Sequence, residues 1–330
     1  MTSSAKQLRV AIENCELPHP QYRKHLDFLK LRIEDALDGA AFRIERVMGP
    51  SRAGKSMLIN SLQRAYPETK QDGRRRVPVL VVSLPTPVSP MKLPSSVVKA
   101  LGLPVQRNGS GDEIATRMAA QLKLAGTRVV IFDEASHLVE PGSYVQLGAA
   151  GDWFKVLAES NNLTLFLFGV PRLERLISAS TQLRLRTSAP RYLMPYDSRL
   201  AEDMQAFHAC VATYANLFRE AGYPIDLPSA ALTYQCYLVS GGLVGVLSRF
   251  MQELAGQSAR SSPRALTFWD CQAAAEGIEA AGSRQFPGFA NPDAIRSDVV
   301  PAVLHQAFVE VMHDNDLAVP VIYQSSGDEI

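Results

Sequence analysis

The chain has 330 residues and a formal net charge of +1, with 46% hydrophobic and 20% charged residues. This composition is that of a globular protein with a substantial core, and it excludes a disordered chain. The near-zero net charge argues neither for nor against nucleic-acid binding, so any basic surface must be local. No apolar run approaches the roughly 18 residues of a membrane-spanning helix, and the polar N-terminus lacks an apolar signal core. We therefore expect a cytoplasmic protein without a membrane partner.

The first half of the chain alternates predicted helices and strands. Residues 1–41 are predicted to be helical, because apolar residues recur at helical spacing. FRIERVM (42–48) predicts a strand, and a helix follows from near Lys55. VPVLVVSL (77–84) is nearly all apolar, as expected for a strand covered on both faces. A proline-rich loop and two helices follow, near 95–101 and 112–125.

The alternation of strands and helices continues to about residue 196. Apolar runs at 128–132 and 163–168 predict buried strands, with a helix carrying GDWFKVLAES between them and a short strand at RYLMP. The pattern changes near residue 198. The chain then has helical periodicity over 198–221, about 229–238, about 242–256 and about 263–281. The predicted domains are an N-terminal helical segment (1–41), an α/β domain (42–196), a helical domain (197–285) and a C-terminal extension (286–330). The four cysteines are scattered, which is typical of reduced thiols: Cys15, Cys210, Cys236 and Cys271.

The stretch GPSRAGKS matches G-x-x-x-x-G-K-[ST] in full, between a predicted strand and a predicted helix. Its glycines permit a backbone that turns successive N–H groups toward one centre, and the helix N-terminus adds its dipole. Lys55 is expected to reach the β and γ phosphates, and the Ser56 hydroxyl is expected to bind Mg²⁺. The predicted nucleotide-binding residues are Gly49, Pro50, Ser51, Arg52, Ala53, Gly54, Lys55, Ser56 and Met57.

Two carboxylates follow the predicted strand at 128–132, at the end where α/β sheets bind ligands. We expect Asp133 to hold the Mg²⁺ shell with Ser56, and Glu134 to polarise a water for attack on the γ phosphate. A kinase that moves phosphate to a small molecule needs no water-activating base at this point, whereas an ATPase does. The pair therefore favours ATP hydrolysis, with Lys55 and Glu134 as catalytic residues.

Further motifs resemble the TniB/TnsC family of transposition ATPases, which are AAA+ proteins. The resemblance covers roughly residues 15–255 and rests on GPSRAGKS, VVIFDEASHL, GDWFKVLAESNNLTLFLFGVPRLERLI, STQLRLRTSAPRYLMPYD and SGGLVGVLSRF, in that order. The first two motifs are shared by all AAA+ proteins. The series DWFKVL…FGVPRLERL…QLRLR…LMPY is what points to this family.

The resemblance implies an AAA+ fold, an α/β nucleotide-binding domain with a parallel sheet flanked by helices and followed by a smaller all-helical lid. It also implies ATP and Mg²⁺ as ligands. Members assemble as rings or helical filaments on double-stranded target DNA and recruit a DDE-type transposase, with a target-selection protein as a further partner. Hydrolysis then disassembles them. A bacterial cytosolic, nucleoid-associated protein follows from this.

In such assemblies the neighbouring subunit supplies an arginine that stabilises charge on the γ phosphate. The matching stretch is QLRLRTSAPRY, where Arg186 is the first candidate and Arg184 and Arg191 are the others. Two positions depart from the AAA+ pattern. Gly169-Val170 stand where a polar sensor residue is common, and in the lid Arg249 falls about one turn beyond the usual basic position.

Contact with DNA is expected to go to the backbone, by charge and not by base reading. The candidates are Lys92, Lys99, Arg117 and Lys123, with Arg74 to Arg76 as a weaker basic cluster. Two alternatives stay open. Another AAA+ ATPase acting on DNA, initiator-like or loader-like, predicts a DNA-reading domain or a pore loop. A P-loop phosphotransferase predicts ATP turnover that depends on a small acceptor and is indifferent to DNA.

Overall fold

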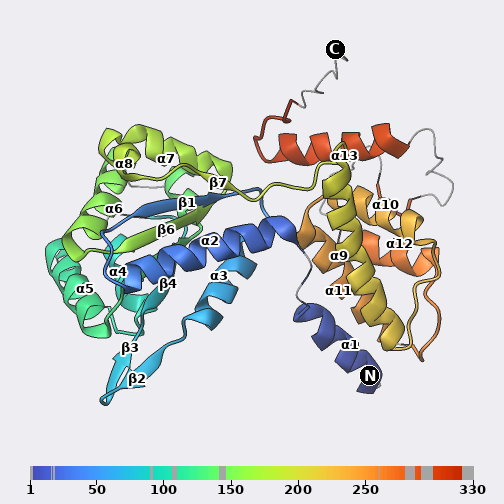
Figure 1. Cartoon of the computed structure of the whole chain (residues 1–330), viewed down its shortest axis with the longest axis horizontal. Helices are drawn as coiled ribbons and strands as arrows, with labels where there is room; N and C mark the ends of the chain where they lie inside the picture. Colours follow the sequence, from blue (N-terminus) through green and yellow to red (C-terminus); the bar gives the residue numbers. More distant parts are fainter. Residues whose placement is uncertain are drawn as a thin grey trace, which may run out of the picture. The chain divides into compact units, whose positions relative to one another are not determined.

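The computed structural model describes residues 3–15, 17, 19–89, 92–105, 110–140, 146–259, 261–278, 287–290 and 300–321. They form two compact units (Figure 1). One unit, His19–Met194, is an α/β sandwich, and the other joins Met1–Pro18 to Pro195–Ile330 and is helical. The predicted fold class, a parallel sheet flanked by helices and a following helical domain, is confirmed.

The α/β unit is built on a five-stranded parallel sheet with the order β4-β5-β6-β1-β7. The strands are β1 (Ile44–Met48), β4 (Val79–Ser83), β5 (Val129–Asp133), β6 (Thr164–Gly169) and β7 (Arg191–Tyr192). The first four coincide with the predicted apolar runs, and β6 is buried along its whole length. Since parallel sheets are covered on both faces, such runs are expected in them.

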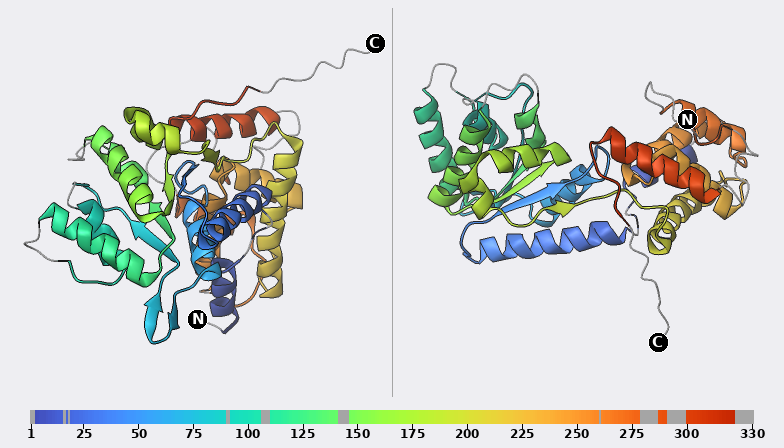
Figure 2. Two further views of the ribbon diagram at one scale, coloured as in Figure 1. Left: turned by 60° about the vertical axis from the view of Figure 1, so that its left-hand side comes forward. Right: turned by 90° about the horizontal axis from the view of Figure 1, so that it is seen from above.

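Helices cover both faces of this sheet (Figure 2). On one face lie α2 (Pro20–Leu37) and α3 (Lys55–Ala65), and the other helices pack on the opposite face. That second layer consists of α4 (Lys92–Ala100), α5 (Gly111–Ala125), α6 (Leu147–Asn161), α7 (Glu174–Ala179) and α8 (Thr181–Arg186), with the 3-10 turns η1 (Ala135–Val139) and η2 (Pro171–Leu173). From β1 the chain crosses to the edge strand β4 and then returns through β5 and β6. Because crossovers between parallel strands are right-handed, this reversal places α3 on one face and the later helices on the other.

Two charged residues inside β1 are neutralised by groups from other elements. Glu45, only 1% exposed, has its Oε1 atom 3.3 Å from Nε of Arg32 on α2. Arg46 pairs with Glu174 at the start of α7 and donates to the Ser188 carbonyl. An unpaired buried charge is strongly destabilising, so these pairs allow charged residues in an inner strand of the sheet.

A β-hairpin that the sequence analysis did not predict precedes β4. Its strands are β2 (Thr69–Gln71) and β3 (Arg74–Arg76), which pair antiparallel. The turn residues Asp72 and Gly73 have φ values of 52° and 74°, as a type I′ turn requires. The signal was Asp-Gly in DGRRRVP, which the sequence analysis interpreted only as a basic cluster.

The helical unit contains α1 (Ser3–Glu13), α9 (Ala201–Glu220), α10 (Ser229–Ser240), α11 (Val244–Ser258), α12 (Phe268–Glu276) and α13 (Val300–Asp314). The structure divides the N-terminal segment expected over residues 1–41. Its first helix, α1, packs on α9 and α11, whereas α2 packs on α3. α13, which lies in the expected C-terminal extension, packs on α10, where Gly241 leaves room for Val311.

Within the described part of the chain, no single helix is long and apolar enough to cross a membrane. Only the bent pair α10 and α11 passes such a test when the two are taken together, across a bend of 111°. Three of the cysteines, Cys210, Cys236 and Cys271, are buried free thiols and Cys15 is half-buried. Burial raises the pKa of Cys210 and Cys271 to about 12, so both thiols are inert near neutral pH.

The core of the α/β unit offers a test of the fold. Phe154 on α6 is fully buried, and its ring meets Phe132 and Trp153 edge-on with centroids 5.0 Å apart in each case. We expect Phe154→Ala to lower the free energy of unfolding by about 3–5 kcal/mol, because it removes the ring and leaves a cavity. The neighbouring Val156 is 54% exposed, so Val156→Ala should change that free energy by less than about 0.5 kcal/mol. Urea unfolding followed by circular dichroism measures both, and equal effects would contradict the packing described.

Candidate nucleotide-binding site

The phosphate loop connects β1 to α3, and β7 presses against its first residue. A Cβ atom placed on Gly49 would collide with the Leu193 carbonyl oxygen, so only glycine fits there. The Leu193 N–H donates to the Met48 carbonyl at 2.8 Å, which continues the β1–β7 pairing up to the loop. The loop is therefore anchored to the sheet at its start.

The second glycine of the loop, Gly54, has a left-handed backbone and leaves free space beside it. Gly54 has φ 98°, which favours glycine, and a Cβ atom there would meet nothing within 4 Å. Arg52 also has a positive φ, 64°, so the backbone reverses its hand within the loop. Together with the N–H groups that a first helical turn leaves free, such a backbone forms a concave anion-binding surface.

The ammonium group of Lys55 lies inside this loop. Its Nζ atom donates to the carbonyl oxygens of Gly49 at 2.9 Å and Pro50 at 2.8 Å, and the residue is only 6% exposed. Burial lowers the pKa of Lys55, while the negative charges of Glu134 and Asp133 oppose that lowering. The site thus holds a buried cation next to two carboxylates.

The two carboxylates stand at the end of β5, as the sequence predicts. Asp133 is the last residue of the strand, and Glu134 has an αL backbone with φ 55°. The Glu134 N–H donates to Asp133 Oδ1 at 2.9 Å, which fixes the direction of that carboxylate. Burial and the Glu134 charge raise the pKa of Asp133, whereas the backbone hydrogen bond, Lys55 and His137 act in the opposite direction.

Two residues of η1 support this pair. His137 shares a hydrogen bond of 3.0 Å between Nδ1 and the Leu84 carbonyl, and its Nε2 lies 4.0 Å from Glu134 Oε2. Ser136 is buried against β6, where its hydroxyl accepts from the Val170 N–H at 3.4 Å. A Cβ atom on Gly169 would come within 3.1–3.3 Å of Ser136 atoms. Ser136 therefore occupies the space at the position where the usual polar sensor is absent, and the sequence analysis missed it.

The residues present fit a nucleotide phosphate chain and Mg²⁺. The loop offers backbone N–H donors and a buried ammonium group for phosphate. For Mg²⁺, which prefers oxygen ligands and keeps water, the loop helix offers the exposed Ser56 hydroxyl and β5 offers Asp133. Among the described residues no group of three or more His, Cys, Asp or Glu could hold a metal by itself. A protein-only metal cage is thus not part of the site described.

Sequence reasoning also missed the start of α2. The Tyr22 hydroxyl bonds to Ser61 Oγ at 2.6 Å and to the Met57 carbonyl at 3.3 Å, both on α3. His25 Nε2 lies 3.0 Å from the Tyr192 carbonyl of β7. These contacts join α2, the loop helix and β7 around the phosphate loop. Only the aromatic and histidine content of HPQYRKH could have signalled them.

The three candidate arginines differ in their surroundings. Arg186 on α8 forms an ion pair with Glu159 of α6. The Arg191 guanidinium lies over the Phe28 ring, 3.1 Å from its centroid, and burial lowers its pKa. Arg184 is exposed on α8. Arg191 is thus packed within its own unit, while Arg184 and Arg186 stand at the surface.

The candidate DNA contacts lie on two neighbouring helices. Lys92 and Lys99 are exposed on α4, and the Lys92 Nζ atom donates to the Pro87 carbonyl at 2.9 Å. Arg117 is half-buried and Lys123 exposed on α5, which packs against α4. Arg249 is exposed on α11, in the helical unit.

A family described as Bacterial TniB protein matches residues 16–194. No curated protein matches the chain by sequence. Among solved structures, Cdc6p from Pyrobaculum aerophilum has a TM-score of 0.60 at 10% identity, covering 93% of this chain and 83% of that chain. The Aeropyrum pernix ORC2 protein in ADPNP–ADP complexes has 0.56 at 15%, covering 79% and 69%. Drosophila ORC bound to DNA has 0.51 at 15%, covering 97% and 81%. At these identities the likeness shows the AAA+ fold alone.

The loop geometry predicts that Lys55→Ala will abolish nucleotide binding. The substitution removes the buried positive charge, and no other cation of the loop is enclosed by its carbonyl groups. Binding of a fluorescent ATP analogue measures the effect. Arg64→Ala is the matched control, because Arg64 is an exposed cation of the loop helix α3 outside the phosphate loop, and it should bind within a few-fold of the parent. Parent-like binding by Lys55→Ala would show that the loop is not the nucleotide site.

Proposed function

The chain belongs to the TniB family, and on this premise we propose that it is an AAA+ ATPase that acts on DNA as an assembly regulator of transposition. The observation that carries the proposal is the phosphate loop with a buried lysine next to the Asp133–Glu134 pair. The assembly binds double-stranded DNA, recruits a DDE-type transposase and receives its target from a target-selection protein. It acts in the bacterial cytosol, at the nucleoid.

In the hydrolysis step, each residue has a role that its position supports. The loop N–H groups and Lys55 would orient the phosphate chain, and Ser56 and Asp133 would hold Mg²⁺. When bound, Mg²⁺ neutralises negative charge on the phosphates. Glu134 accepts the proton of the attacking water, and His137, 4.0 Å from its carboxylate, positions it. The Glu134 N–H donates to Asp133 Oδ1 and so fixes the neighbouring carboxylate.

A shared active site links hydrolysis to assembly. The arginine that stabilises the γ phosphate comes from the neighbouring copy in a ring or filament, and Arg186 remains our first candidate. Its ion pair with Glu159 can exchange for a phosphate, because both side chains are about one-third exposed. Exposed ion pairs contribute little stability, about 0–1 kcal/mol. Arg184 on the same helix is the second candidate, and Arg191 is the third because it is packed over Phe28.

DNA binding through α4 and α5 would use charge. Lys92, Lys99, Arg117 and Lys123 would contact phosphates, which gives affinity that falls steeply with salt and carries no base preference. A second candidate function, an initiator-like or loader-like ATPase, is favoured by the fold shared with the Cdc6p and ORC structures. The match of residues 16–194 to the TniB family supports the transposition role, so we place that role first. A phosphotransferase is a more distant alternative.

The central experiment asks whether hydrolysis is a timer. Glu134→Gln keeps the side-chain shape but removes the base, and loss of such catalysis typically costs about 10²–10⁴-fold in rate. ATP binding should persist because Lys55 and Ser56 are unchanged. The variant should stay on DNA longer than the parent and still recruit its transposase. Dwell time on DNA, measured beside integration yield, checks this. A short dwell with normal ATP binding contradicts the timer, and failure of every later step indicates mechanical work instead.

A mixing experiment identifies the shared arginine. Arg186→Ala should bind ATP like the parent but turn it over slowly in the assembly. Mixed with Glu134→Gln subunits, it should regain turnover, because its intact carboxylate meets the intact arginine of a neighbour. Arg184→Ala serves as the matched substitution two residues away on α8. Rescue with Arg184→Ala alone would assign the role to Arg184, and absence of rescue for both would contradict a shared site at α8.

A further inference from the structure

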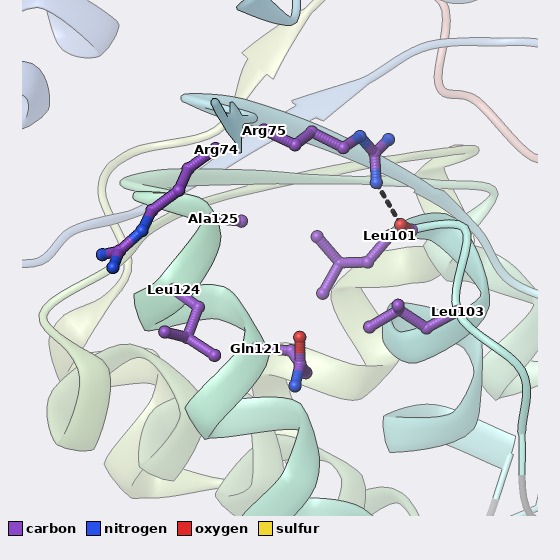
Figure 3. A pocket seen from close by; sticks show the side chains of 7 residues that line it. All are labelled: Arg74, Arg75, Leu101, Leu103, Gln121, Leu124 and Ala125. Carbon is purple, nitrogen blue, oxygen red and sulfur yellow. Dashed lines mark hydrogen bonds between the residues drawn. The ribbon is translucent and has the colours of Figure 1, made fainter. Parts of the chain in front are cut away.

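A pocket of about 300 Å³ lies between the β2–β3 hairpin and the helices α4 and α5 (Figure 3). Leu101, Leu103 and Leu124 form its apolar lining, and Arg74, Arg75 and Gln121 supply polar groups. β3 precedes β4, and α5 precedes β5, so the pocket lies at the amino ends of these strands. Gly49 and Asp133 lie at the carboxyl ends of β1 and β5 in the same parallel sheet. The pocket is therefore separate from the nucleotide site.

The walls of the pocket are held in place by several bonds. Arg75 donates to Glu68 and to the Leu101 carbonyl, which ties the hairpin to the end of α4. At the base of the hairpin, the Val77 N–H donates to the Ala125 carbonyl at 2.9 Å, and the Thr127 hydroxyl donates to the Val77 carbonyl at 2.8 Å. A pre-formed pocket lowers the entropic cost of binding.

The pocket combines an exposed apolar side chain with an arginine at its edge. Leu124 is 60% exposed, although it is a large apolar residue in the last turn of α5. Arg74 is exposed at the edge of the pocket, and no ion pair among the described residues involves it. Of the two acidic residues in the hairpin segment, Glu68 is engaged by Arg75, and Asp72 lies in the turn between β2 and β3. Exposed Lys70 and Lys123 add positive charge on the same elements.

We propose that this pocket is a docking site for a segment of a partner protein, with a bulky apolar side chain flanked by carboxylates. The apolar side chain inserts between Leu124 and Leu101, and a carboxylate faces Arg74. Such a segment would gain binding energy both from contact with the leucines and from the charge of the arginine, as anchor residues of bound peptides do. A DNA phosphate would gain from the arginine only, because placing it against leucine side chains costs solvation. The observations thus favour an acidic–apolar peptide over DNA.

The test is selection of random peptides from a displayed library on the full chain. We expect the enriched peptides to share an apolar side chain next to Asp or Glu. In fluorescence anisotropy with the purified chain, Leu124→Glu and Arg74→Glu should each weaken their binding at least about tenfold, as loss of an anchor does. Leu31→Glu and Arg219→Glu are matched controls, because both residues are exposed on other surfaces, and they should bind the peptides like the parent.

Two outcomes would overturn the proposal. One is enrichment of no peptide whose binding depends on both Leu124 and Arg74. The other is that both variants weaken binding of a duplex DNA as strongly as that of the peptides, which would make this a nucleic-acid surface. Parent-like thermal melting of the variants, expected because both side chains are exposed, excludes unfolding. The Lys55→Ala variant should bind the peptides normally, so failure of the proposed ATPase function would leave this result unchanged.

Discussion

A positive charge held out of water is the constraint around which the α/β unit is arranged. Burial disfavours the ammonium of Lys55, and two loop carbonyls with the carboxylates of β5 compensate for it. The carbonyls come from the end of β1 and the carboxylates from the end of β5, with β6 between the two strands. The parallel register therefore places oppositely charged groups from distant parts of the sequence at one edge of the sheet.

The same sheet carries charge inside β1, and those charges connect the surrounding elements. Glu45 is held by Arg32 of α2, and Arg46 is held by Glu174 of α7. Polar contacts of Tyr22 and His25 add α3 and β7 to this connected set. Separating such a pair would leave a buried charge without its partner, which is strongly destabilising. These contacts therefore hold α2, β1 and β7 together beside the phosphate loop. The loop is pre-organised for phosphate before any ligand binds.

The two edges of the sheet have different chemistry. The carboxyl edge concentrates a lysine, two carboxylates and loop N–H groups, which suits a phosphate chain and Mg²⁺. The amino edge has a pocket with leucines and free arginine, which suits a protein segment. The hairpin is tied to the end of α4 by the Arg75 side chain and to α5 by a backbone hydrogen bond between Val77 and Ala125.

Local patterns determined most of the fold and the centre of the site. The buried strands, the phosphate loop and the Asp133–Glu134 pair could be predicted, because apolar runs and glycine spacing act through neighbouring residues. The hairpin was readable in Asp-Gly but was missed. Only the tertiary structure decided that α1 joins the helical unit, that the Ser136 hydroxyl meets the Val170 N–H, that Arg191 packs over Phe28, and that a pocket forms beside Leu124. Each of these depends on contacts between residues far apart in the chain, which no local pattern encodes.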